Sequence, residues 1–272
     1  HAHTILSLPP LGATAAFRRI LIAVREHEVY VIGDVHGMVD PLEELLREIH
    51  GDAESRGLHP FHVFVGDLVD RGPDSAGAIA VVRALVEEGK AACVLGNHDE
   101  MFLQSLAANR ADLLGDDWVP PVDASAAAML NHWISQGGDA TIRSYACDPL
   151  LPKSWAFPSK DVEFLACLPL YWEDDALVVT HALASREALQ AARRPGGEKD
   201  PRVRHELLWN REQPSISPDP DRLHISGHTP LRNAVLHQAI NAIQLDTGCV
   251  FGLAISAYAS GSGQLLSVPC HG

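Results

Sequence analysis

Five short apolar segments of the chain end in residues that can bind a cation or a phosphate group. Three of them end in a glycine followed by polar side chains: GDVHG at 33–37, GDLVDRG at 66–72 and GNHD at 96–99. Two more lie further along the chain and end in Thr180-His181 and in GHTP at 227–230. Glycine permits sharp turns that bring backbone close to an ion, and open α/β sheets bind ligands at the carboxyl ends of their strands. We therefore expect the five ends to converge on one site.

The side chains at these ends are typical of a two-metal centre. Residues i and i+2 of an extended turn point the same way, so Asp34 and His36 can bind one ion together. Asp67, on a neighbouring strand, is then placed between that ion and a second one. The ligands that would complete the second site are Asn97, His181 and His228. Carboxylate, carboxamide and imidazole groups without thiolates suit two divalent ions such as Mn, Fe or Zn, and the sequence does not choose among these metals.

A pair of such ions promotes attack of water on a phosphoester, and nearby residues could supply the remaining chemistry. His98 follows Asn97 and is the candidate general acid, while Asp70 could orient it as a triad carboxylate orients its histidine. Arg71 and Arg211, together with Asn97, are the candidate phosphate-binding side chains. Taken singly, each of these residues is also typical of a cap, a loop or a core position, and the Trp-x-Arg segment at 209–211 could serve packing alone. Their joint occurrence favours a site.

The bulk composition is that of a globular chain with neither a nucleic-acid nor a membrane surface. Its 272 residues are 46% apolar, which is enough for a substantial core. The net charge of −14 leaves no basic excess for a nucleic-acid backbone, and no apolar run reaches the roughly 18 residues of a membrane span. The five cysteines are odd in number without a C-x-x-C pair, so neither a disulfide framework nor a thiolate zinc site is expected. A reducing, cytoplasmic location is the default expectation.

The spacing of apolar residues predicts alternating strands and helices in the first part of the chain. Strands expected at 29–32, 61–65 and 91–95, each followed by a helix, begin a parallel α/β sheet. Residues 109–170 show helical patches and weak strand signals, so we interpret them as a helical insertion or cap beside the site. Short β-rich runs between 234 and 268 are expected to form antiparallel strands of a second sheet.

The division of the chain follows from these elements. Residues 1–27 are interpreted as a peripheral N-terminal segment, and residues 28–272 as one domain that includes the 109–170 insertion. The first 25 residues carry Arg18, Arg19 and Arg25 without an acidic residue, which fits either a cleavable targeting segment or a trimmed end. Asp246, which precedes Thr247, is interpreted as a turn residue near the site.

The ordered set of motifs, together with the single His181 after a strand, resembles the phosphoprotein phosphatase branch of the calcineurin-like metallophosphoesterases. The resemblance spans about residues 29–258. It implies a four-layer αββα sandwich in which helices flank two mixed sheets, and a dinuclear centre that hydrolyses phosphoesters. By motif position it implies the same ligands for the two metals, the bridging role of Asp67, the acid pair of Asp70 and His98, and phosphate binding by Arg71.

Departures from the family pattern bear on the substrate. Asp99 stands where the protein phosphatases usually carry Glu. Leu183 takes the place of the glycine in the His-Ala-Gly that usually follows the strand. Asp70 is retained, whereas the symmetrical diadenosine tetraphosphate hydrolases commonly lack it. WNRE at 209–212 and GGDATIRSY from Gly137 resemble bacterial serine/threonine phosphatases.

The sequence therefore predicts a monomeric serine/threonine protein phosphatase, broad enough to accept phosphotyrosine, that acts on a phosphoprotein or a phosphorylated small molecule. A symmetrical diadenosine tetraphosphate hydrolase releasing ADP is the alternative enzyme. A catalytically inactive metal-binding or docking module is the alternative from another class, although the complete set of ligands with His98 counts against it.

Overall fold

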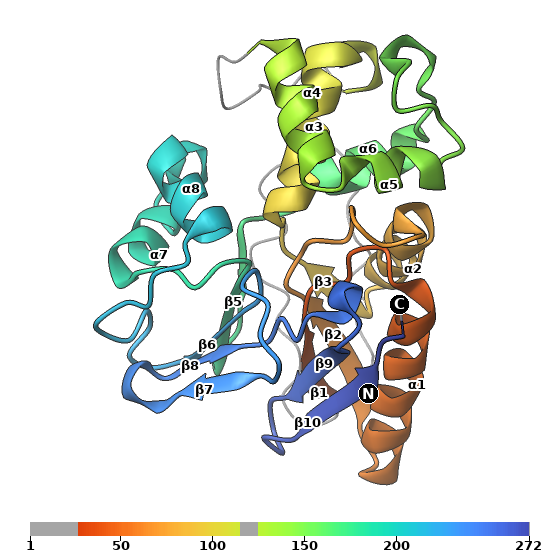
Figure 1. Cartoon of the computed structure of the whole chain (residues 1–272). Coiled ribbons are helices and arrows are strands. Elements are labelled where there is room, and N and C mark those ends of the chain that lie inside the picture. Colours follow the sequence, from red (N-terminus) through yellow and green to blue (C-terminus); the bar gives the residue numbers. More distant parts are fainter. Residues whose placement is uncertain (1–26, 115–124, 272) are drawn as a thin grey trace, which may run out of the picture.

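Two mixed β-sheets form the centre of the molecule (Figure 1), in a computed structural model that describes residues 27–114 and 125–271. Within these residues the first sheet has the order β10-β9-β1-β2-β3 and the second the order β4-β5-β6-β8-β7. The strands of the first sheet are β1 (His27–Ile32), β2 (His59–Phe64), β3 (Ala91–Cys93), β9 (Ala254–Ala259) and β10 (Leu265–Pro269). Those of the second are β4 (Tyr171–Glu173), β5 (Leu177–Thr180), β6 (Leu223–Ser226), β7 (Val235–His237) and β8 (Ala242–Gln244). The expectation for the N-terminal segment falls almost wholly outside the described residues.

The predicted parallel start of the chain is confirmed. Strand β2 pairs parallel with both β1 and β3, and the crossovers are α1 (Val39–Ser55) and α2 (Ser75–Glu87). Each helix turns its apolar residues inward, for example Leu45 of α1 and Ile79 of α2, both fully buried. Parallel pairing places the carboxyl ends of all three strands at one edge of the sheet, where the three glycine motifs begin.

The two sheets are held together by aliphatic side chains from their facing surfaces. This cluster includes Val31 and Val63 of the first sheet and Val179 and Ile225 of the second, all buried. A larger core lies between the first sheet and its helices. Two mixed sheets with flanking helices are the calcineurin-like architecture that the sequence predicted.

The prediction that the last strands all belong to the second sheet was wrong. Strands β7 and β8 do pair antiparallel there, but β9 pairs with β1 and β10 with β9 in the first sheet. Strand β8 also runs parallel to β6. An alternation of apolar and polar residues indicates that one face of a strand is buried, but it does not indicate which strand lies next to it. The chain returns to the first sheet through a short 3-10 turn, η6 (Cys249–Phe251).

Helices occupy the described part of residues 109–170, as predicted. Helix α3 (Asn97–Asn109) leads into η2 (Ala111–Leu113), α4 (Ala126–Ser135), α5 (Gly138–Ser144), η3 (Pro152–Ser154) and α6 (Ser159–Ala166). Buried aromatic rings join them, because Phe102 lies 5.5 Å from Trp133 and Trp133 lies 6.0 Å from Trp155, between ring centroids. These helices gather on one side of the molecule, above the first sheet in Figure 1.

The remaining helices are α7 (Arg186–Ala192), η4 (Gly197–Lys199), α8 (Pro201–Trp209) and η5 (Gln238–Ile240). Helix α8 begins at Pro201, because the side chain of Asp200 caps it and proline suits its first turn. Among residues 27–114 and 125–271, none of the helices has the length and apolar character needed to span a bilayer.

The prediction of no disulfide was wrong for one cysteine pair. Cys249 and Cys270 are bonded, whereas Cys93, Cys147 and Cys167 are free thiols. The antiparallel return of β10 brings the two sulfurs together, with the N–H of Cys270 donating to the carbonyl of Leu253 at 2.8 Å. A spacing of 21 residues carries no recognisable motif, so the pairing depends on the strand order. The cytoplasmic location stays a prediction that the cysteine pattern no longer supports.

Candidate active site

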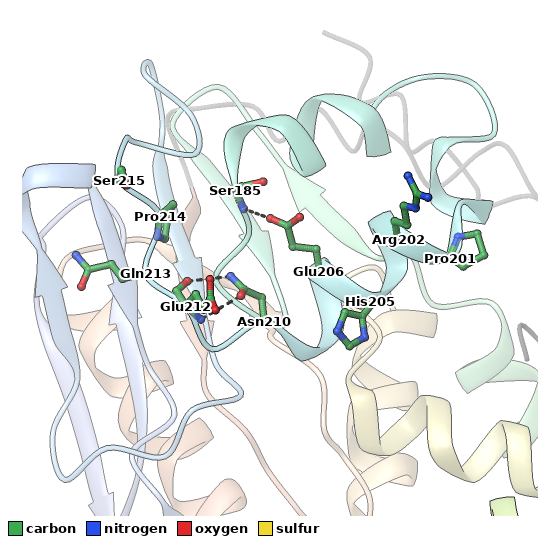
Figure 2. Close-up of a pocket in the computed structure, with 10 residues that line it drawn as sticks. All are labelled: Ser185, Pro201, Arg202, His205, Glu206, Asn210, Glu212, Gln213, Pro214 and Ser215. Atoms are coloured by element: carbon green, nitrogen blue, oxygen red, sulfur yellow. Dashed lines mark hydrogen bonds between the residues drawn. The ribbon is translucent and has the colours of Figure 1, made fainter.

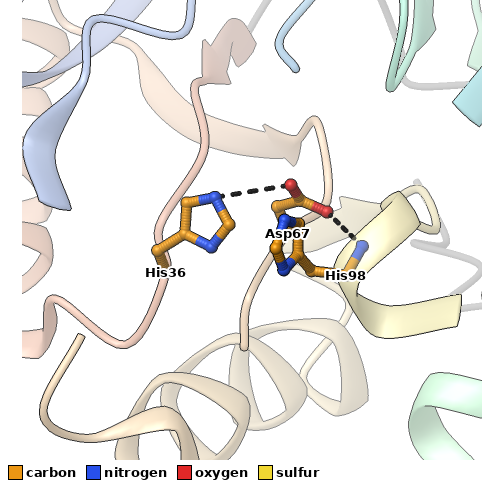
Figure 3. A group of neighbouring side chains, drawn as sticks. All are labelled: His36, Asp67 and His98. Atoms are coloured by element: carbon orange, nitrogen blue, oxygen red, sulfur yellow. Dashed lines mark hydrogen bonds and ion pairs between the residues drawn. The ribbon is translucent and has the colours of Figure 1, made fainter. Parts of the chain in front are cut away.

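The predicted metal ligands meet where the strand ends of the two sheets face each other. One ligand atom from each of Asp34, Asp67 and His181 lies within 4.8 Å of the others, and the same holds for His36, Asp67 and His98. Figure 3 shows the second group, with the ring of His36 facing the carboxylate of Asp67. All of these side chains are buried. Asp67 belongs to both groups, which is the geometry expected of a bridging ligand.

Tight turns aim these side chains. Gly66 has a φ of +94°, and a Cβ placed there would lie 2.5 Å from the backbone nitrogen of Gly96, so two glycine motifs pack against each other. Several of the predicted site residues also adopt the left-handed backbone region: His36, Asp67, Asp70, Arg71 and His228. Non-glycine residues rarely hold such angles unless the surrounding structure imposes them, and they cluster at functional sites.

Backbone carbonyls fix the tautomers of two histidines. The Nδ1 atom of His36 lies 2.7 Å from the carbonyl of Val69, and Nδ1 of His181 lies 2.8 Å from the carbonyl of Val65. A carbonyl only accepts, so each Nδ1 carries the proton and donates it. The Nε2 atoms of both rings are therefore unprotonated, and an unprotonated Nε2 is the atom with which such a histidine binds a cation. In this structure Nε2 of His36 lies 2.8 Å from Nη1 of Arg71.

Asn97 joins the other two ligands. Its Oδ1 atom lies 2.8 Å from Nε2 of His181 and 2.9 Å from Nδ1 of His228. The N–H of His228 donates to both oxygens of Asp34 at 3.1 Å, so the two halves of the ligand set touch. Nε2 of His228 is buried without a hydrogen-bond partner in the described structure.

The electrostatics of the cluster fit bound cations. Burial raises the pKa of Asp34 well above its usual range, with Asp246 and Asp67 adding to the effect. Burial lowers the pKa of His181 and of His228 to about 3. Divalent ions bind ionised carboxylates and neutral imidazoles, so they would relieve the carboxylate repulsion and use the neutral rings. The donor set and its geometry therefore fit two divalent ions.

Two acidic residues have roles that sequence analysis missed or understated. The carboxylate of Asp99 accepts hydrogen bonds from the N–H groups of Asp67 at 2.9 Å, Leu68 at 3.0 Å and Gly96 at 3.0 Å. It thereby ties the bridging turn to the start of α3, and its position three residues after Gly96 is the capping-box spacing that could have indicated this. Asp246 does more than form a turn, because it is buried close enough to Asp34 to raise its pKa.

The two residues of the candidate acid pair, His98 and Asp70, lie in contact. Nδ1 of His98 lies 2.7 Å from Oδ2 of Asp70, and the N–H of His98 donates to Oδ1 of Asp67 at 2.9 Å. Burial lowers the pKa of His98 to about 4 and raises that of Asp70 well above its usual range. Because Nδ1 of His98 contacts Asp70, Nε2 is the ring atom left to act on substrate, and it must carry a proton of its own to serve as a general acid.

The two candidate arginines differ in how firmly they are held. Nη1 of Arg71 lies 2.8 Å from Nε2 of His36, and its guanidinium lies 5.6 Å from the ring centroid of Phe251. Phe251 is a contact that the sequence did not suggest, because it is an apolar residue in a loop. Arg211 is exposed beyond the end of α8, and its charge contributes, after burial, to the low pKa of His228. Arg71 is therefore held within the site by its contacts, whereas Arg211 lies exposed at the rim of the site.

Pockets flank helix α8. One of about 700 Å³ lies between α7, α8 and the segment after α8 (Figure 2), and its lining includes Asn210 and Glu212, the neighbours of Arg211. Its wall is braced where Nδ2 of Asn210 donates to the carbonyl of Leu183 at 2.6 Å. A second pocket, of about 250 Å³, is lined by His132 and Trp209 among others. The Trp209 ring lies 6.3 Å from that of His228, so this pocket lies beside one of the candidate metal ligands.

The fold and this set of side chains define a metal-dependent phosphoesterase. The chain matches the family model of the calcineurin-like phosphoesterases over residues 27–250 and belongs to that family, whose members use a dinuclear divalent metal centre. It is a hydrolase.

Relatives within the family carry different names. The chain is 32% identical to serine/threonine-protein phosphatase 1 of Salmonella typhimurium, over 82% of this chain and 88% of that one. It is 27% identical to an asymmetrical bis(5'-nucleosyl)-tetraphosphatase of a Geobacillus species, over 89% and 94%. The solved structure of a cold-active protein tyrosine phosphatase from a Shewanella species matches with a TM-score of 0.50 at 14% identity, over 89% and 81%, which supports the fold.

Proposed function

We propose that this phosphoesterase is a serine/threonine protein phosphatase that also accepts phosphotyrosine. The observation that carries the proposal is the intact His98–Asp70 pair beside the ligand cluster, because alkoxide leaving groups such as serine need protonation. The 32% identity to a serine/threonine-protein phosphatase over most of both chains supports the same choice.

The ligand roles are assigned from motif position. Asp67 is assigned to the position between the two ions because it belongs to both groups of neighbouring side chains, one with Asp34 and His181 and the other with His36 and His98. Asp34 and His36 would hold one ion, Asp67 would bridge, and the residues that would hold the second ion are Asn97, His181 and His228. When bound, the ions supply a Lewis acid for the phosphoryl oxygens and lower the pKa of the attacking water. Mn is the metal proposed for assay, with Fe and Zn as alternatives.

The side chains of the protein perform the remaining steps. Arg71, and Arg211 from the rim, would bind the phosphoryl oxygens, with Asn97 contributing a further contact. Water adds to phosphorus as the P–O bond to the alcohol breaks. His98 donates its Nε2 proton to the leaving oxygen, and Asp70 stabilises the ring by accepting from Nδ1. The products are the free alcohol and inorganic phosphate.

Hydrolysis of a dinucleoside tetraphosphate is the second candidate, favoured by the relative of that name. Its leaving group is a nucleotide phosphate, a weaker base than an alkoxide, which has less need of a general acid. The two functions share the metal chemistry and differ in what the flanking pockets must hold.

A side-by-side assay tests the proposal. Metal-loaded protein is given a phosphoserine/phosphothreonine peptide, a phosphotyrosine peptide and diadenosine tetraphosphate, with Asp67→Asn as the control. Faster peptide turnover that the variant abolishes is expected. Faster release of nucleotides would assign the protein to the tetraphosphatases, with ADP marking symmetrical cleavage and ATP plus AMP asymmetrical cleavage. Failure to hydrolyse any of the substrates with Mn, Fe or Zn would indicate an inactive module.

A further inference from the structure

The carboxylate of Asp70 is enclosed by donors from the helical segment as well as by His98. Nε1 of Trp133, from α4, donates to Oδ1 at 2.9 Å and to Oδ2 at 3.0 Å. Oγ1 of Thr141, from α5, donates to Oδ1 at 2.6 Å. Asp70, Trp133 and Thr141 have no exposed surface. Both oxygens of the carboxylate are therefore fixed, and Oδ2 is the one presented to His98.

The same threonine also holds the backbone of Asp70. The N–H of Asp70 donates to Oγ1 of Thr141 at 2.8 Å and to Oγ of Ser75 at 3.1 Å. Asp70 has a φ of +74°, a conformation that costs a non-glycine residue free energy and needs support from its surroundings. The next residue is held likewise, since the N–H of Arg71 donates to the carbonyl of Gly137 at 3.1 Å.

The indole that reaches Asp70 is itself immobilised. Its ring packs against Phe102 and Trp155, and a Cβ at Gly138 would lie within 2.4–2.5 Å of its atoms. Because Gly138 has no Cβ, the Trp133 ring fits against it, and the close contact leaves the ring little space to move. Rotation of Trp133 away from Asp70 would require the helical segment to move.

We infer that Trp133 and Thr141 are positioning residues for the general acid, holding the Asp70 carboxylate so that Oδ2 fixes the ring of His98. The inference rests on the proposed function. It extends the role of the 109–170 segment from a cap beside the site to a support for its general acid. On this account the orientation of Asp70 requires a hydrogen-bond donor from each of the two helices, and side chains of similar size without a donor would not replace them.

The test uses two variants that conserve side-chain shape. Trp133→Phe removes the indole N–H, and Thr141→Val removes the hydroxyl that donates to the Asp70 carboxylate and accepts from the Asp70 N–H. Matched controls are Trp172→Phe, which removes a buried indole of β4 that stacks on Phe61, and Thr141→Ser, which keeps the hydroxyl. Metal-loaded proteins are assayed on a series from p-nitrophenyl phosphate to unactivated alkyl phosphates. The kcat on poor leaving groups is expected to fall roughly 10- to 100-fold in both donor variants, with little change on p-nitrophenyl phosphate or in KM, while the controls follow wild type.

A second readout needs neither metal nor turnover. In the metal-free protein, the proton on Nδ1 of His98 should give a downfield NMR resonance because it is hydrogen-bonded to a carboxylate. This resonance is expected to shift or broaden in Trp133→Phe and Thr141→Val and to persist in Trp172→Phe and Thr141→Ser.

Equal losses of kcat across all leaving groups, or an unmoved resonance in both donor variants, would overturn the inference. Thr141→Val conserves shape, so it remains informative if Trp133→Phe does not fold. A wild-type protein that hydrolyses no phosphoester would refute the proposed function, and the NMR comparison would still decide whether the two donors position His98.

Discussion

Nδ1 of His98 lies 2.7 Å from Oδ2 of Asp70, and the two side chains are 3% and 0% exposed. The contact joins the GDLVDRG and GNHD motifs, which follow neighbouring parallel strands, and the two residues are 28 positions apart in the chain. It places an imidazole beside a cluster of metal ligands while keeping that imidazole hydrogen-bonded to a carboxylate. The proposed phosphatase activity depends on this pairing.

Replacing His98 with Asn should affect substrates in proportion to the basicity of their leaving group. Loss of the general acid is expected to lower kcat on phosphoserine peptide by roughly 10²- to 10⁴-fold. The loss on p-nitrophenyl phosphate should be much smaller, because nitrophenolate leaves without a proton. Steady-state kinetics on both substrates checks this, and near wild-type turnover of the peptide would exclude His98 as the acid.

The stability of the metal-free protein should fall in acid because of a histidine outside the ligand set. His224 is fully buried, its Nε2 lies 2.7 Å from Oγ1 of Thr180, and burial lowers its pKa to about 3. The unfolded chain binds that proton at a pKa of about 6.5, so stability present at higher pH is lost as the pH falls from about 6.5 toward 3.

For this one group the loss at pH about 5 is about 2 kcal/mol. His224→Gln keeps a polar side chain that does not titrate. Between neutral pH and pH about 5, the free energy of unfolding measured in urea should therefore fall by about 2 kcal/mol less in this variant than in wild type. His205→Gln, at an exposed position, is the control. Identical pH dependence in wild type and His224→Gln would contradict the assignment.

The Cys249–Cys270 disulfide should stabilise the fold through its loop. The bond closes a loop between cysteines that are 21 residues apart, which in the chain-entropy model raises the free energy of unfolding by about 3 kcal/mol. The Cys249→Ser, Cys270→Ser double variant should lose about that much in urea unfolding, and reductant should bring wild type to the same value. Cys167→Ser, which removes an exposed free thiol, should change little. A wild-type midpoint insensitive to reductant would show that the bond is not formed.

Phe251 should support phosphate binding through Arg71. Its ring lies 5.6 Å from the guanidinium and is 58% exposed, so the cation–π contact is worth roughly 0.5–1 kcal/mol. Phe251→Ala is therefore expected to lower kcat/KM by roughly two- to fivefold, because Arg71 is less well placed. Leu253→Ala, in the same loop and partly exposed, is the matched control. An equal effect of both variants would point to the loop rather than to the contact.

The sequence indicated which residues gather at the candidate site better than it indicated the strand order. Each ligand motif follows a strand within a few residues, so glycine and ligand type alone indicated Asp34, Asp67 and Asn97. The partner of β9 depended on long-range pairing, which local periodicity does not encode. The contact of Trp133 with Asp70 could not be predicted for the same reason, because the two residues are 63 positions apart in the sequence.

Metal content measured alongside turnover is the most direct test of the central claim that Asp67 bridges two ions. Wild-type protein dialysed against Mn and analysed by elemental mass spectrometry should hold two ions per chain and hydrolyse the phosphopeptide. Asp67→Asn, with its fold verified by circular dichroism, should lose at least one of the two ions and nearly all of the turnover. A variant that keeps both ions and full activity would contradict the account.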